Sequence, residues 1–219
     1  MEDNKNLESK LEEGMSESDL FSGAIEAVKL LFSQKPLAAF EYVKKSKVPL
    51  GCVLASLYVL VMAVASVYVG AAPIRVINET LGVFVHIDIP YGDLFVRGFT
   101  FGAVSLVAFV VALHLYFVLA KKSVTIQSTI NFVSVALTPV TLLGVVVFIA
   151  SFINVGFATT LLMTSSLIGV MLLIGGLPKF LNDTFKLTWL LIGCLAVAQL
   201  ITFALLNWVI ILGTLSALF

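Results

Sequence analysis

Charged residues are scarce in this chain and are missing from four long stretches. They make up 12% of the 219 residues, against 60% hydrophobic residues, whereas roughly a quarter of the residues in a soluble domain are charged. Asp, Glu, Lys and Arg are absent from 48 to 74, 98 to 120, 123 to 178 and 187 to 219, runs of 27, 23, 56 and 33 residues. Because a membrane-crossing helix needs about 20 apolar residues, the third run predicts two spans and each of the others predicts one.

The sequence also lacks the common catalytic motifs. It contains no G-x-S-x-G, H-E-x-x-H or paired acidic motif, which are patterns that bring a nucleophile, a metal or an acid and base together. Ion pumps and ion-coupled carriers place ionisable groups inside the membrane, but here only Arg97 touches the edge of a predicted span. We therefore predict that the chain is not an enzyme and has no catalytic or cofactor-binding residues.

Cysteine and clustered metal ligands are equally sparse. Cys52 and Cys194 both fall in predicted spans, nearer the cytoplasmic leaflet. Because thiols stay reduced on the cytoplasmic side, we interpret both as small apolar packing residues and not as a redox pair. His86 and Asp88 alternate in V-F-V-H-I-D-I and would share a face, but two ligands do not make a zinc site. No metal site is predicted. The segment from 72 to 94 is expected to be a loop outside the membrane that contains a short strand or an extended interfacial stretch.

Three regions follow one another along the chain. Residues 1 to 19 carry a net charge of −5 and are expected to form an acidic mobile tail. Residues 20 to 47 carry a net charge of +3 and form cytoplasmic amphipathic and juxtamembrane helices, suited to an anionic leaflet rather than to nucleic acid. Their apolar face consists of Leu20, Phe21, Ala24, Ile25, Val28, Leu31 and Phe32. Residues 48 to 219 form the membrane domain, with spans at about 48–71, 95–120, 130–153, 157–177 and 187–212.

The basic residues predict the orientation of these spans. With a cytoplasmic N-terminus, eleven lysines lie on the inside and only Arg75 and Arg97 lie on the outside, which is a clear positive-inside bias. Trp189 and Trp208 are 19 residues apart, about 28 Å along a helix, and match the two aromatic belts of a bilayer. We predict an all-α, multi-pass protein of the bacterial plasma membrane, with its N-terminus cytoplasmic and its C-terminus outside.

A few residues interrupt the apolar spans. Gly98 and Gly102 have the spacing that lets two membrane helices approach closely. Pro139 predicts a kink, with its freed carbonyl satisfied by a neighbouring helix, Thr138 or Thr141, and Pro178 is expected to end the fourth span. The candidate polar and kink positions of the bundle are His114, Asn131, Thr138, Pro139, Gln199 and Asn207. We interpret them as groups that form hydrogen bonds between helices, in preference to a proton relay.

Two stretches resemble a known family. The first is a span ending in ALHLYFVLAKK, a link SVTIQST and a span centred on ALTP, with His114, Gln127 and Pro139 as its sharpest points. The second is FSQKPLAAFEYVKKSKVP before the first span. Together they are similar to the Yip family, five-span membrane proteins named for interaction with Rab-type GTPases. The D-L-Y-G-P and G-Y sequences of the eukaryotic trafficking members are absent, so the resemblance is to a bacterial member.

Two functions remain open at this point. The first is a non-enzymatic membrane protein of Yip type, which would organise or recruit membrane components through a protein partner at its cytoplasmic N-terminal region. The second is a small permease for a neutral solute, or an accessory subunit of a transporter. A shared cavity lined by His114, Asn131, Thr138, Gln199 and Asn207 would favour the permease, whereas separate contacts with helix backbones would favour the first function.

Overall fold

The chain folds into a bundle of long helices. The computed structural model describes residues 17–46, 49–81, 87–181 and 189–215, and all of the regular structure in these ranges is helical. The elements are α2 (Glu17–Leu31), α3 (Ala38–Lys45), α4 (Leu50–Leu81), α5 (Tyr91–Leu119), α6 (Ile126–Ala150), α7 (Val155–Leu181) and α8 (Trp189–Leu215). Within the described ranges, five helices are long and apolar enough to cross a membrane. The predicted five-span, all-α architecture is confirmed.

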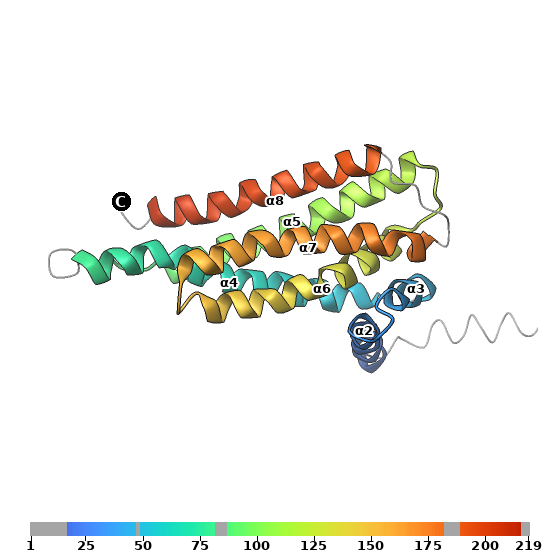
Figure 1. The fold of residues 1–219 in the computed structure, drawn as a ribbon, viewed down its shortest axis with the longest axis horizontal. Helices are drawn as coiled ribbons and strands as arrows, with labels where there is room; N and C mark the ends of the chain where they lie inside the picture. The colour runs from blue at the N-terminus through green and yellow to red at the C-terminus, as the bar shows by residue number, and fades with distance from the viewer. Residues whose placement is uncertain (1–16, 47–48, 82–86, 182–188, 216–219) are drawn as a thin grey trace, which may run out of the picture.

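Helices α4 to α8 run along one long axis, and α2 and α3 lie across one end of the bundle (Figure 1). We call this the lysine-rich end, because Lys29, Lys44, Lys121 and Lys179 belong to the elements that meet there. Helix α4 packs most closely against α5 and α6, while α7 packs mainly on α6 and α8 mainly on α5. Helix α6 lies deepest, since every residue from 131 to 138 is buried.

Several helices extend beyond the expected spans. Helix α4 continues through Pro73 to Leu81 and α5 begins at Tyr91, so the expectation that residues 72 to 94 form a loop is wrong at both ends. Ile74 is fully buried beyond the proline, and this packing outweighs the lost backbone bond. Likewise, α7 passes through Pro178 to Leu181, because Phe180 is held in the bundle at 1% exposure. Pro178 therefore does not end the helix.

The link between α4 and α5 is held by an asparagine side chain. The amide nitrogen of Asn78 donates to Ile87 O at 2.8 Å, and its oxygen accepts from Ile87 N at 2.9 Å. Residues 87 to 90 are neither helix nor strand. The predicted strand and the His86 candidate fall partly or wholly in residues 82–86, outside the described residues. Among the described residues, no group of three potential metal ligands occurs.

Gly98 and Gly102 of α5 pack closely against another helix, as predicted, and that helix is α4. A Cβ atom on Gly98 would lie 2.7 Å from Ala63 O and from Ser66 Cβ, and one on Gly102 would lie 3.1 Å from Val59 Cα. The small surface of these glycines therefore lets the two helix backbones come together.

Each described arginine lies beside aromatic rings, away from the lysine-rich end. Arg97 pairs with Asp93 at 2.7 Å and lies over the Trp208 ring, 5.3 Å from its centroid. Arg75 donates to Tyr68 O at 2.7 Å and lies 5.8 Å from the centroid of the Tyr68 ring. Trp189, at the other end of α8, is 87% exposed. The two tryptophans thus lie toward opposite ends of the bundle, as the belt interpretation requires.

Candidate functional site

Asn131 caps a helix that begins far away in the sequence. Its side-chain oxygen accepts a 2.9 Å hydrogen bond from Gly51 N, one of the first-turn amides of α4 that have no acceptor within their own helix. A Cβ atom on Gly51 would lie 2.6 Å from Asn131 Cα. Asn131 is 1% exposed, so this bond joins the start of α4 to the deepest part of α6.

His114 contacts the first turn of α6. Its Nδ1 atom lies 3.4 Å from Thr129 Oγ1, and the Thr129 hydroxyl donates to Thr125 O at 3.1 Å. His114 therefore joins α5 to α6 next to the link that connects them.

Pro139 lies inside an unbroken α6. The Thr138 hydroxyl donates to Ser134 O and the Thr141 hydroxyl donates to Leu137 O, each at 3.1 Å. The carbonyl that the proline ring frees is that of Val135, four residues earlier. Of the three predicted partners for this carbonyl, Thr138 and Thr141 are wrong, because both hydroxyls bond to other carbonyls of the same helix. The third, a neighbouring helix, stays a prediction.

The last two candidates lie on α8. Gln199 donates to Ser166 Oγ of α7 at 2.7 Å, and Asn207 donates to Phe203 O of its own helix at 3.0 Å. Gln199 Oε1 is buried without a hydrogen-bond partner. Gln199 therefore connects the two flanking helices, whereas Asn207 bonds only to its own backbone among the contacts described.

These six positions do not form one site. Asn131, His114 and Gln199 connect three different helix pairs, while Thr138 and Asn207 bond to their own helices. None of the six lines the five cavities described for the bundle. The contacts of these residues thus join separate helix pairs or stay within one helix, and they do not converge on any of the described cavities.

An aromatic cluster holds α3 against the bundle. It consists of Phe40, Phe117, Phe132 and Phe180, each at most 1% exposed. The centroid of the Phe132 ring lies 5.1 Å from that of Phe40 and 4.5 Å from that of Phe180. A Cβ atom on Gly176 would lie 2.7 Å from the Phe40 ring. Sequence reasoning did not find this cluster, because its members come from four helices.

A small polar hollow adjoins the cluster. It has a volume of about 310 Å³ and is bordered by Lys44 of α3, residues 122–125 of the α5–α6 link, Ser128 and the end of α7. Thr125 caps α6 here, accepting a 3.2 Å bond from Ser128 N. Lys44 and Lys122 give the lining a positive charge, although the hollow has no counterpart among the predicted site residues.

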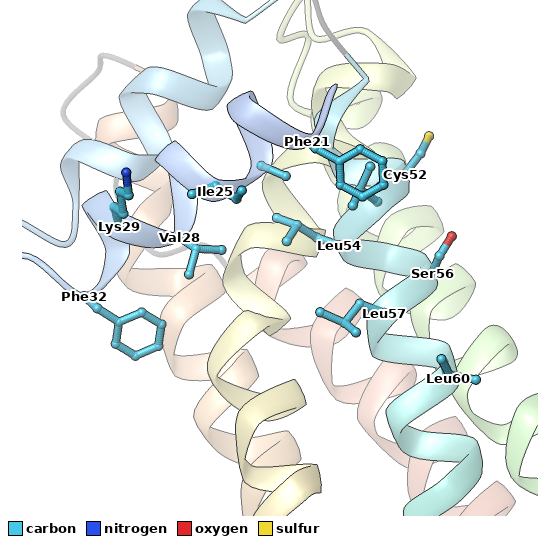
Figure 2. Close-up of a pocket in the computed structure, with 12 residues that line it drawn as sticks. Phe21, Ile25, Val28, Lys29, Phe32, Cys52, Leu54, Ser56, Leu57 and Leu60 are labelled. Atoms are coloured by element: carbon cyan, nitrogen blue, oxygen red, sulfur yellow. The ribbon is translucent and has the colours of Figure 1, made fainter. Parts of the chain in front are cut away.

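The largest of the five described cavities is an apolar groove between α2 and α4, with a volume of about 930 Å³. Figure 2 shows α2 lying across the first turns of α4, with side chains from both helices facing the same space. The predicted apolar face of α2 is divided here: Ala24 and Leu31 are buried, whereas Phe21, Ile25 and Phe32 are exposed. Cys52 is also exposed at the groove, so its interpretation as a packing residue is wrong, while Cys194 packs partly against the core.

Comparisons with known proteins identify no relative of this chain. No family model, curated protein or solved structure matches the chain.

Proposed function

We propose that this multi-pass membrane protein is non-enzymatic and organises or recruits other membrane components through the helices at its lysine-rich end. The observation that carries the proposal is the attachment of α3. Phe40 is fully buried against Gly176 and Phe132, while Lys44 on the same helix is exposed. A helix that is fixed on one side and exposed on the other is a preorganised contact surface for a partner.

The arrangement of the polar residues supports an organising role over transport. A permease for a neutral solute needs convergent polar groups along a cavity. Here Asn131, His114 and Gln199 are engaged at three different helix contacts. The permease, or an accessory subunit of a transporter, remains the alternative function, and it predicts solute flux in proteoliposomes.

We further propose that the lysine-rich end is cytoplasmic, in a bacterial plasma membrane. Lys29, Lys44 and Lys121 are exposed at this end, and cytoplasmic loops of membrane proteins are enriched in lysine and arginine. The recruiting helices α2 and α3 would then face cytoplasmic partners.

The resemblance to the Yip family is part of this proposal. The five spans, and the proline-containing segment that precedes them, are in keeping with it. Of its sharpest residues, His114 contacts Thr129 and Pro139 lies in the buried helix α6. The family assignment predicts a protein partner and no catalysed reaction.

Affinity purification in mild detergent tests the recruiting surface. The tagged chain, its Phe40→Ala variant and its Phe101→Ala variant would be compared for proteins that purify with them. Phe101 is a matched control, because it is also buried, at 3% exposure, but lies ten residues from the start of α5, in the half of the bundle away from α3. We expect Phe40→Ala to lose a partner that Phe101→Ala retains.

Two outcomes would contradict the proposal. Equal recovery of every co-purifying protein with both variants would show that α3 does not recruit. Solute flux in proteoliposomes that is lost in an Asn131→Ala variant would favour the permease instead.

A further inference from the structure

The groove between α2 and α4 is apolar along almost its whole length. Helix α2 contributes Phe21, Ile25 and Val28, and α4 contributes Leu57 and Leu60. Its volume of about 930 Å³ lies within the range of roughly 300–1,000 Å³ that is typical of sites for small molecules. The groove therefore has the size and lining of a binding site for an apolar molecule.

One wall of the groove, formed by α4, faces the acyl chains of the membrane. Leu57 and Leu60 are 47% and 52% exposed on a helix that is long and apolar enough to span the bilayer, so they lie among acyl chains. Helix α2 crosses α4 near Cys52, and α4 then continues downward in Figure 2 to Leu60. Val28 and Phe32 lie on the lower side of α2 in the same view. The groove is thus continuous with the surface of α4 that faces lipid.

The charged side chain that lines the groove, Lys29, is positive. Lys29 is exposed and lines the groove, and in Figure 2 its nitrogen lies on the side of α2 away from Phe32. A lysine on an interfacial helix extends its ammonium group toward the headgroups while its stem covers apolar surface. None of the lining residues described is acidic, and Glu26, the nearest acidic residue along α2, is not one of them.

We infer that the groove binds an acyl chain of an anionic phospholipid, and that Lys29 pairs with the phosphate of the same molecule. Two features select this occupant: the groove opens onto the lipid-facing side of α4, and its rim is positively charged. Lipid binding of this kind goes beyond the recruiting function and does not depend on it.

Quenching of a tryptophan reporter by brominated lipids tests this inference. Trp189 and Trp208 would be replaced by Phe, and a single reporter would be introduced as Leu60→Trp in the groove or Met171→Trp on α7. Both positions are exposed and lie ten residues from the lysine-rich end of their helices, Leu50 and Leu181. Each protein would be placed in vesicles that contain brominated phosphatidylglycerol or brominated phosphatidylcholine.

We expect phosphatidylglycerol to bind at the Leu60→Trp reporter about fivefold more strongly than phosphatidylcholine, the factor that one lysine supplies beside anionic lipid. The Met171→Trp reporter should show no such preference. Adding Lys29→Gln should abolish the preference at Leu60→Trp. Lys35→Gln should preserve it, because Lys35 is exposed but does not line the groove. Circular dichroism would confirm that all variants keep their helical content.

Three results would overturn the inference. Equal preference at the two reporters would show that the effect comes from the general charge of the membrane surface. A preference that survives Lys29→Gln would remove the proposed ion pair. A Leu60→Trp reporter that neither lipid quenches would mean that protein, such as a second copy of the chain, covers the groove.

Discussion

The backbone N–H of Gly51 donates to the side-chain oxygen of Asn131, 2.9 Å away, although the two residues are 80 positions apart in the chain. The bond supplies an acceptor from the buried helix α6 to the first turn of α4. Because a Cβ atom on Gly51 would lie 2.6 Å from Asn131 Cα, the same contact also sets how closely the two helices approach. Capping and close packing therefore depend on one pair of residues.

Removing the Asn131 side chain should destabilise the start of α4. We expect Asn131→Ala to lower the free energy of unfolding by about 1 kcal/mol, the typical loss when a helix cap is removed. Unfolding in mixed micelles of mild detergent and dodecyl sulfate, followed by circular dichroism, measures the change. Asn207→Ala is the control, because Asn207 is exposed and bonds to its own helix. Equal losses in the two variants would count against the cap.

Adding one methyl group to Gly98 should separate α4 from α5. The new Cβ would lie 2.7 Å from the backbone oxygen of Ala63, and overpacking of this kind costs about 1–3 kcal/mol. Gly193→Ala is the control, because nothing lies within 4 Å of its Cβ position and alanine favours helix by up to about 1 kcal/mol. The same unfolding assay should therefore give opposite signs for the two variants. A neutral Gly98→Ala would contradict the close helix contact.

Truncating Phe132 should be among the costliest changes in the bundle. Its ring is fully buried between those of Phe40 and Phe180, so Phe132→Ala is expected to lose about 3–5 kcal/mol. Phe99→Ala removes the same ring from a position that is 51% exposed and should change stability by about 0.5 kcal/mol or less. Thermal unfolding of both proteins in detergent would distinguish them. Similar melting temperatures would be inconsistent with the cluster.

Arg97 and Trp208 should be energetically coupled. Their separation of 5.3 Å from guanidinium carbon to ring centroid predicts a cation–π contribution of about 0.5–1 kcal/mol at an exposed site. A double-mutant cycle with Arg97→Gln and Trp208→Leu measures this coupling. The matched cycle with Trp189→Leu should give none, since Trp189 lies at the opposite end of α8. Coupling of the same size in both cycles would rule out a direct contact.

The distribution of basic residues predicts that the two chain ends lie on opposite sides of the membrane. In a bacterium, alkaline phosphatase fused after Phe219 should be active, and a green fluorescent protein fused there should be dark. Fusions at the N-terminus should behave in the opposite way. An inactive phosphatase together with a fluorescent C-terminal fusion would reverse the assigned orientation.

The spans could be predicted because burying charge in lipid is costly, so the absence of charge marks membrane segments directly. Gly98 could be assigned to helix packing for a similar reason, since only a small side chain admits another backbone. The ends of the helices were harder to place. Ile74 and Phe180 extend α4 and α7 beyond their prolines through burial, and burial depends on neighbours that a linear pattern does not show.

The local contacts of the candidate residues could be anticipated in part. Asn131, His114 and Gln199 each contact a group on another helix, as a polar side chain in lipid requires, while their role as a functional site stays a prediction. Their partners could not be assigned. Nothing in the sequence around Gly51 indicates that α6 packs against it. Likewise, Ala24 is buried and Ile25 is exposed on the same apolar face of α2, because α4 lies beneath only one edge of that helix.

The contact between Phe40 and Gly176 also determines an order of assembly. Gly176 lies on α7, the fourth of the five long helices in chain order, so α3 can pack on Phe132 of α6 but cannot complete its docking until α7 has inserted. During that interval the Phe40 ring has no partner on α7, and a chaperone or an early binding partner could reach it. The last steps of biogenesis therefore complete the N-terminal helices, which are the first part of the chain to be made.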